Sequence, residues 1–303
     1  AKLIVLNSQF SKLTMKPTAG QTGFLALLLF CLLSCVSAYN YLVVLHTAAR
    51  SHYHVGSALA KGLAAAGHQV TIISPFELKK PIKNIKDVPA KSILTSMQGR
   101  IANLLQSSKE PIIKQIINFH EMGIEITELL LKEPSVIELM KSNQFDAVIS
   151  EVFLNEAHFG FAEHFKAPLI GLGTFGAISW NTDLVGSPSP PSYVPSALLK
   201  FSDRMSLVER VGQAFLTYEY IFLNYFYLPR QEVLYRKYFP NNKQDFYDMR
   251  KNTALVLLNQ HVSLSFPRPY SPNMIEVGGM HINRKRQPLP KDILEFIEGA
   301  EHG

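Results

Sequence analysis

The sequence predicts an α/β protein built on a doubly wound, parallel sheet. Short segments rich in apolar and β-branched residues recur along the chain, and one of them, 41–45, has no polar break, which is typical of a strand buried on both faces. Between such segments, apolar residues recur every three to four positions, as in amphipathic helices. Strands that alternate with helices favour parallel pairing, because each crossover connection lays a helix over one face of the sheet.

The clearest predicted unit covers residues 41–75 and consists of a strand, a loop, a helix and a second strand. Ser51 is expected to cap the helix, since serine side chains accept hydrogen bonds from free helix amides, and Gly67 is expected to end it. His52 then lies just after the carboxyl end of the first strand, at the helix N-terminus. Open α/β sheets bind their ligands in that crevice, so His52 becomes the first candidate for chemistry.

The rest of the chain continues the alternation. A polar, lysine-rich loop is expected up to Lys91, and Pro134 is expected to interrupt the helical pattern that follows. Glu151 comes at the carboxyl end of a predicted strand. In chain order, the pattern predicts helices over 101–140, strand 145–150, helix 155–165, strand 168–172, an irregular Pro/Ser loop over 186–195, helix 207–227, and strands 253–258 and 275–279, before a polar end with a short helical run.

The helix predicted over 207–227 is rich in Phe and Tyr, and its role has two interpretations. It packs into the core, or it forms the wall of an apolar binding pocket or a face that dips into a membrane. Glu209, Arg210 and Glu219 interrupt the apolar residues, which argues against a membrane span.

Residues 15–38 are predicted to be a cleaved secretory signal peptide. A short basic start is followed by the apolar run 24–36, which is too short to span a bilayer, and small residues up to Ala38 form the cleavage site. The mature chain is then expected to begin at Tyr39, and residues 1–14 are interpreted as sequence upstream of the true start. An uncleaved signal anchor is the alternative, against which the small residues at the cleavage site argue.

The positions of the cysteines and of the charged residues indicate the compartment of the protein and the classes of partner it binds. Both cysteines, Cys31 and Cys35, lie in the predicted signal peptide, so the mature part is expected to rely on its core, in the secretory pathway. The net charge of +6 is spread along the chain, and the densest lysine cluster, within 79–91, is accompanied by no nucleic-acid-binding motif. We therefore expect a solvated loop there and no nucleic-acid partner. No metal-ligand spacing is present either.

Four stretches of the sequence, in order, resemble membrane-bound UDP-glycosyltransferases, particularly the insect branch. They are SHYHVGSALAKGLAAAGHQVTIISPF at 51–76, FDAVISEVFLNEA at 145–157, LVLLNQHVSLSFPRPYSPNMIEVGGMHI at 255–282 and PLPKDILEFIEGAEHG at 288–303. The resemblance covers nearly all of 39–303.

The resemblance implies that the fold is the Rossmann-like N-terminal half of a two-domain GT-B glycosyltransferase. Residues 39–282 would be the acceptor-binding domain, and residues 283–303 a linker towards a nucleotide-sugar domain that the sequence does not contain. A C-terminal membrane anchor would also lie beyond Gly303. The expected protein is a detoxification enzyme of the endoplasmic reticulum membrane, facing the lumen, and the chain alone would be inactive. Homo- and hetero-oligomers are both left open.

The reaction that the resemblance implies is transfer of a hexose, glucose or glucuronic acid, from a UDP-sugar to a small lipophilic acceptor hydroxyl, with inversion. It requires a base, because an alcohol is a poor nucleophile until its proton leaves. His52 matches the family's catalytic histidine, and Glu151 stands where many members have Asp, as the carboxylate that orients and supports the imidazole. Ser51, Tyr53, His54, Thr174 and Phe175 are the predicted acceptor-binding residues. No metal or cofactor is expected beyond the UDP-sugar co-substrate.

Other residues compete for these roles. His54 is interpreted as a neighbour of His52, His68 as a structural turn residue, and His46 as a residue that lines the cleft. Asp146 is the alternative carboxylate, although it stands at the other end of its strand. The glycine-rich piece 171–176 lacks the spacing of a phosphate loop and is interpreted as tight packing near the cleft.

Two hypotheses compete with sugar transfer. In the first, the chain is a non-catalytic module that binds lipophiles or associates with full-length enzymes. In the second, it is a secreted α/β hydrolase. The hydrolase needs a G-x-S-x-G nucleophile elbow, and the sequence contains none.

Overall fold

The computed structural model describes residues 38–100, 110–196, 199–282 and 288–302. Residues 40–303 form one compact unit. The predicted signal peptide and the residues before it lie almost entirely outside the described part, as do residues 101–109 of the predicted long helical region and the beginning of the predicted linker.

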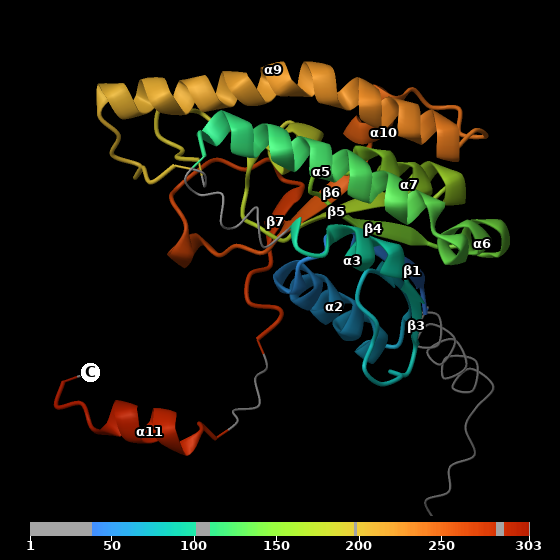
Figure 1. Ribbon diagram of the computed structural model, residues 1–303, viewed down its shortest axis with the longest axis horizontal. Helices are drawn as coiled ribbons and strands as arrows, with labels where there is room; N and C mark the ends of the chain where they lie inside the picture. The colour runs from blue at the N-terminus through green and yellow to red at the C-terminus, as the bar shows by residue number, and fades with distance from the viewer. Residues whose placement is uncertain (1–37, 101–109, 197–198, 283–287, 303) are drawn as a thin grey trace, which may run out of the picture. The chain divides into compact units, whose positions relative to one another are not determined.

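A seven-stranded sheet forms the centre of the unit, and every pair of neighbouring strands is parallel. The order is β3-β2-β1-β4-β5-β6-β7, so the prediction of a doubly wound parallel sheet is confirmed (Figure 1). The strands are β1 (Asn40–Val44), β2 (Gln69–Ser74), β3 (Ile85–Pro89), β4 (Ala147–Glu151), β5 (Leu169–Gly173), β6 (Thr253–Leu258) and β7 (Met274–Glu276). Because the order reverses between β1 and β4, a crevice opens there at the carboxyl ends of the strands.

Helices cover both faces of the sheet. Figure 1 shows the long helix α9 (Leu207–Tyr238) alongside α5 (Ile112–Lys132) over one face, and α2 (Arg50–Ala65) below the other. The remaining helices are α3 (Lys91–Met97), α6 (Pro134–Ser142), the 3₁₀ helix η3 (Glu156–Phe159) that runs into α7 (Gly160–Phe165), α8 (Ser179–Thr182) with the 3₁₀ turn η4 (Asp183–Val185), α10 (Phe246–Lys251), η5 (Val262–Leu264) and α11 (Lys291–Glu298).

Apolar side chains on the two faces of β1 belong to separate clusters. Leu42 and Val44 of β1 belong to the larger cluster, together with residues of α5, α7 and α9. Val43 and Leu45 point the other way and pack with Ala60 and Ala64 of α2. This explains why residues 42–45 are all apolar, since both sides of the chain are covered there.

Several elements differ from the sequence prediction. Ser51 does not cap α2, because the helix begins one residue earlier and Ala49, with extended dihedrals, takes the cap position without a side-chain hydrogen bond. The loop expected up to Lys91 contains the edge strand β3, whose lysine and aspartate give it a polar appearance. The aromatic helix continues past Tyr227 and through Pro229. The predicted break at Pro134 is confirmed, because Pro134 begins α6.

Capping explains where α9 begins. Ser206 and Glu209 form a reciprocal capping box, in which the Ser206 amide donates to the Glu209 carboxylate at 2.7 Å and the Glu209 amide donates to the Ser206 hydroxyl at 3.4 Å. Within the described ranges, no helix is long and apolar enough to cross a bilayer.

Candidate active site

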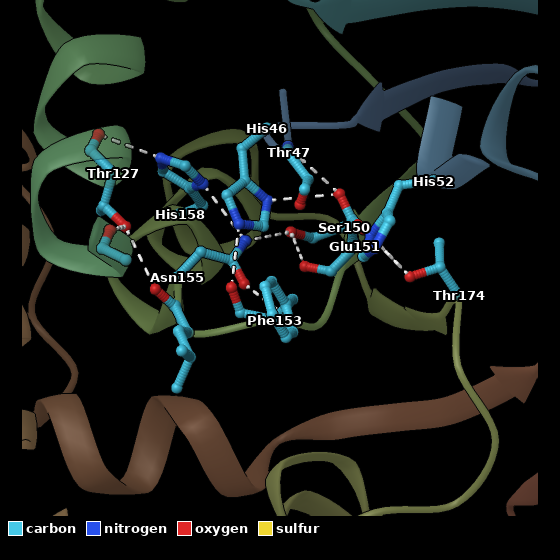
Figure 2. A network of polar contacts seen from close by, with 12 residues as sticks. His46, Thr47, His52, Thr127, Ser150, Glu151, Phe153, Asn155, His158 and Thr174 are labelled. Atoms are coloured by element: carbon cyan, nitrogen blue, oxygen red, sulfur yellow. Dashed lines mark hydrogen bonds and ion pairs between the residues drawn. The ribbon is translucent and has the colours of Figure 1, made fainter. Parts of the chain in front are cut away.

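The candidate site lies at the carboxyl ends of three strands, where the strand order reverses. His52 is the third residue of α2, which follows β1, and Glu151 is the last residue of β4. Thr174 directly follows β5. The parallel sheet therefore brings together three side chains that are far apart in the sequence, as Figure 2 shows.

His52 and Glu151 form a buried hydrogen-bonded pair. The ring Nδ1 of His52 lies against Oε1 of Glu151, and the Thr174 hydroxyl lies 2.9 Å from Nδ1 and donates to Oε1 at 3.1 Å. The other carboxylate oxygen accepts the Thr47 amide at 3.3 Å. Glu151 is 0% exposed and His52 only 8% exposed, so water does not compete for these contacts.

The carboxylate of Glu151 stays ionised in this setting. Burial by itself raises the pKa of Glu151, but the neighbouring His52 and His46 and the Thr47 amide outweigh burial and hold the pKa at about 2. An ionised carboxylate only accepts hydrogen bonds, so the proton of neutral His52 is on Nδ1. Nε2 then carries the free lone pair, which is the arrangement of a general base held by a carboxylate.

A second layer of histidines lies behind Glu151. His46 donates from Nε2 to the Phe153 carbonyl at 2.9 Å, and its Nδ1 lies 3.5 Å from Oε2 of Glu151 (Figure 2). His158 donates to the Thr127 carbonyl at 3.1 Å and accepts from the Asn155 amide at 3.2 Å. Burial lowers the pKa of His46 and, together with the neighbouring His46, the pKa of His158. The sequence interpretation of His46 as a cleft residue is wrong, because it is buried beneath the pair.

The loop after β4 brings an aromatic wall to the pair. Leu154 adopts a left-handed conformation with φ of 58°, which is uncommon for a residue other than glycine, and its side chain is buried. The turn leaves the Phe153 ring 5.5 Å from the His52 ring, and Phe175 meets the same imidazole edge-on at 4.9 Å. The His52 ring therefore contacts two aromatic side chains, Phe153 and Phe175.

An apolar cavity of ≈ 260 Å³ opens beside these rings. This is slightly below the usual range for ligand pockets, roughly 300–1,000 Å³. Mostly apolar and aromatic side chains form its walls, among them Phe119 and His120 of α5, Phe153, Phe175, Trp180 of α8 and Leu216 of α9. The inner face of the aromatic helix is thus a pocket wall, while its outer face carries exposed Phe and Tyr residues.

A second, wider cavity of ≈ 670 Å³ lies on the α2 side of His52. It is lined by His52 itself and by four of the predicted acceptor-binding residues: Ser51, His54, Thr174 and Phe175. Phe175 lines both cavities. Tyr53 lines neither of these two cavities, because its ring packs 5.3 Å from Phe76 against the core below α2.

The competing residues lie elsewhere. Asp146 precedes β4 at the opposite end of the strand, where it accepts the Asn40 amide at 2.7 Å, so it does not meet His52. His68 packs edge-on against Tyr41 at 5.3 Å, as befits a structural residue. A methyl group at Gly173 would come 2.9 Å from the Asn181 side chain, which agrees with tight packing in the glycine-rich piece.

Sequence reasoning missed Phe153, Trp180 and His120 as cavity residues. They come from a loop and from two helices that pack together only in the tertiary structure, and α8 was not predicted at all. One signal was available, since Trp180 is the only tryptophan in the chain and it closely follows the glycine-rich piece. Among the residues that the structure covers, no group of three or more His, Cys, Asp or Glu side chains is placed to hold a metal ion.

Comparison with known proteins identifies the family of this chain. The model of the "UDP-glucoronosyl and UDP-glucosyl transferase" family matches residues 43–303. A UDP-glucosyltransferase 2 of Dactylopius coccus is 32% identical over 260 residues, which cover 84% of this chain and 49% of that protein. The human UDP-glucuronosyltransferase 1A8 is 24% identical, over 84% of this chain and 50% of that protein.

Solved structures give a weaker likeness. The glycotransferase of kitacinnamycin matches with a TM-score of 0.41 and 16% identity, over 74% of this chain and 46% of that one, and a likeness of this size adds nothing to the site. The chain spans about half the length of the curated relatives it matches.

Proposed function

Because this chain belongs to the UDP-glucuronosyl and UDP-glucosyl transferase family, we propose that the protein transfers a hexose from a UDP-sugar to the hydroxyl of a small lipophilic acceptor. Glucose and glucuronic acid are the two sugars considered, and the anomeric carbon is inverted. The observation that carries the proposal is the buried His52–Glu151 pair beside an apolar cavity.

The proposed chemistry uses His52 as general base. The acceptor oxygen attacks the anomeric carbon while its proton passes to Nε2 of His52. The bond from that carbon to the β-phosphate oxygen breaks, and UDP leaves with the electron pair. The imidazolium that forms lies against Glu151, whose negative charge is already in place and offsets the new positive charge.

The two cavities suit the two substrates. The apolar cavity beside Phe153 and Phe175 would take the acceptor, since removal of apolar surface from water favours binding there. The wider cavity at Ser51, His54 and Thr174 would receive the sugar, which the other part of the protein carries as UDP-sugar. The prediction that these three residues bind the acceptor is untested, and the proposal places them where acceptor and sugar meet beside His52. Holding both reactants beside one base turns a bimolecular reaction into an effectively unimolecular one.

The compartment belongs to the same proposal. The signal-peptide pattern over 15–38 and the absence of cysteine from the rest of the sequence support a protein of the endoplasmic reticulum that faces the lumen. Membrane attachment would come from a segment outside this chain. A glycosylation tag inserted into the exposed Pro240–Asn241 turn should become glycosylated in cells, and an unmodified tag would contradict a lumenal location.

The deciding test of transfer is His52→Ala in the full-length protein. With a panel of phenols and other lipophilic alcohols and either UDP-sugar, loss of a general base is expected to lower kcat by roughly 10²–10⁴-fold. His68→Ala is the matched control, because this second histidine packs against Tyr41 away from both cavities. Unchanged turnover in His52→Ala would sink the role of His52. Acceptor binding without any turnover in the unaltered protein would favour a binding module instead.

A further inference from the structure

Among the described residues, five buried side-chain polar atoms in the wall of the apolar cavity have no hydrogen-bond partner, and two of them belong to neighbouring rings, those of Trp180 and His120. The other three are Oε1 of Glu219, the Tyr220 hydroxyl and Nε of Arg268. Within the described part of the chain, nothing pairs with Nε1 of Trp180 or Nε2 of His120, and both residues line the cavity. A buried polar group without a partner destabilises the folded protein, and native proteins keep few of them. Both atoms therefore point to a polar group that belongs in the cavity when a ligand is bound.

The roles of the two atoms are fixed by chemistry. The indole nitrogen of Trp180 only donates. His120 donates from Nδ1 to the Ile116 carbonyl at 2.8 Å, and burial lowers the pKa of His120, so its ring is neutral and Nε2 accepts. At 5% exposed, His120 has little access to bulk water. Trp180 and His120 thus offer one donor and one acceptor on neighbouring rings of the cavity wall.

A hydroxyl group matches this pair. The two rings face each other edge to plane, with centroids 6.5 Å apart. One oxygen can accept the Trp180 proton and donate its own proton to His120, whereas an ether or a carbonyl oxygen can only accept. An ether or carbonyl would leave His120 unpaired, and a methyl group would leave both atoms unpaired.

The donor and acceptor lie one aromatic side chain away from the base. The Phe153 ring is 5.5 Å from the His52 ring on one side and 5.4 Å from the Trp180 ring on the other. A rigid scaffold of two or three fused rings spans such a distance. Its sides would lie against Phe153 and Phe119, whose rings meet edge-on with centroids 6.2 Å apart.

We propose that the cavity selects lipophilic diols, in which a rigid apolar scaffold carries one hydroxyl to His52 and a second hydroxyl to Trp180 and His120. Which hydroxyl reacts rests on the proposed function; recognition of the second hydroxyl does not. In the empty cavity a water molecule would take the same place, and the ligand hydroxyl that displaces it keeps both hydrogen bonds.

The test measures binding by calorimetry to the full-length protein with no UDP-sugar present, so that it does not depend on turnover. Three probes differ at one position: a naphthol, the same naphthol with a methoxy group on the far ring, and the dihydroxynaphthalene. One good hydrogen bond is worth about 1 kcal/mol, and 1.4 kcal/mol is a tenfold change in Kd. We expect the diol to bind roughly tenfold more tightly than the naphthol, with the methoxy compound in between.

Three variants identify the atoms. Trp180→Phe removes the donor. His120→Asn withdraws the acceptor, because the Asn side chain ends at the level of Nδ1 and does not reach the place of Nε2, while its amide can still donate to the Ile116 carbonyl. Each should cut the advantage of the diol to about threefold or less and change naphthol binding little. Phe119→Leu is the control for shape, because it reshapes the wall without a polar atom and should weaken all three probes alike.

The inference is overturned if the diol binds the unaltered protein no more tightly than the naphthol, or if its advantage survives in both Trp180→Phe and His120→Asn. A melting temperature for each variant shows whether it is folded. If only one of Trp180→Phe and His120→Asn folds, that variant alone decides the test. A clear preference for the diol in a protein that transfers no sugar would support the inference and count against the proposed function. Sugar transfer to both the naphthol and the diol, with equal Kd for the two, would support the proposed function and count against the inference.

Discussion

Glu151 determines the charge of the proposed site at the scale of the single residue. Its two oxygens are held by different elements, one by His52 and Thr174 and the other by the Thr47 amide. With the pKa of Glu151 at about 2, the carboxylate stays negative throughout the neutral range. The charge that supports an imidazolium is therefore present before any acceptor binds, so no reorganisation is needed during the reaction.

Replacement of Glu151 by Gln should therefore lower kcat far more than it changes KM. The amide keeps the shape of the side chain but loses the charge, and its NH₂ group can force the His52 proton onto the wrong nitrogen. By analogy with a carboxylate that holds a catalytic imidazole, we expect kcat to fall by roughly 10²–10⁴-fold. Steady-state kinetics on the full-length protein with saturating UDP-sugar measure both constants.

Two further variants sharpen this result. Glu151→Asp keeps the charge but retracts it by one methylene group, so it should lose less activity than Glu151→Gln. Asp146→Asn changes a carboxylate at the other end of the same strand, against the Asn40 amide, and should leave kcat unaltered. A Gln variant as active as the unaltered protein would show that the charge of Glu151 plays no part.

At the scale of secondary-structure elements, the position of Phe153 depends on close packing between α5 and the loop after β4. Gly123 of α5 lies so near Leu154 that an added methyl group would come 2.7 Å from the Leu154 Cβ and its carbonyl oxygen. Both are backbone-linked atoms that cannot turn aside. The glycine therefore allows the loop to lie directly on the helix, and with it the aromatic wall of the site.

Gly123→Ala should destabilise the protein through this contact. Overpacking of a tight interface costs about 1–3 kcal/mol, and the Leu154 turn would have to move. Gly62→Ala in α2 is the matched control, because that glycine is exposed and has no neighbour within 4 Å. There alanine should stabilise the helix by roughly 0.5–1 kcal/mol. Urea unfolding gives both free energies; a Gly123→Ala variant as stable as the unaltered protein would contradict the packing argument.

The elements that sequence patterns predicted correctly are those whose composition is determined mainly by burial of apolar side chains. The strand at 41–45 and the strand that ends in Glu151 are buried on both faces, so the first is apolar throughout and the second is apolar up to Ile149. The edge strand β3, with the sequence IKDVP, pairs on one side only and keeps Lys86 and Asp87, so nothing in its composition distinguishes it from a loop. The start of α2 was misplaced because Ser51 is a good cap but the backbone turns into the helix one residue before it.

At the scale of the whole molecule, the predicted topology placed the site, whereas the cavity was beyond reach of the sequence. A parallel sheet whose order reverses between β1 and β4 must bring the ends of these strands together, and that alone unites His52 with Glu151. The cavity is assembled by α5, α8, α9 and two loops, and its shape depends on how the helices pack. Periodicity shows which face of a helix is apolar, but it does not show which neighbour that face meets.

The packing that forms the site also makes the molecule sensitive to acid. His158 is fully buried, and burial together with the neighbouring His46 holds the pKa of His158 at about 3, below the ordinary value of 6.5. The unfolded chain therefore binds a proton between pH 6.5 and about 3 that the native state does not. Stability must fall as the pH falls through this window, by up to about 1.4 kcal/mol per pH unit for one such histidine.

His46 and His120 act in the same direction, since burial also lowers their pKa. Glu156 acts in the opposite direction. Burial raises its pKa, so the native state binds a proton above the ordinary value of 4.5, and this contribution to stability is lost as the pH rises. A comparison of variants is therefore needed to isolate one histidine.

His158→Gln isolates it, because the Gln amide can still donate to the Thr127 carbonyl in place of Nε2 but does not titrate. The variant should be less stable at neutral pH, because the Asn155 amide loses its acceptor, yet its free energy of unfolding should fall less steeply between pH 6.5 and 4.5, by about one proton. Urea unfolding at a series of pH values measures the slope.

Gly62→Ala shifts the whole curve without altering a titratable group, so its slope should match that of the unaltered protein. Equal slopes for His158→Gln and the unaltered protein would mean that the native state takes up the His158 proton as readily as the unfolded chain, and that the histidines behind Glu151 are not held neutral by burial.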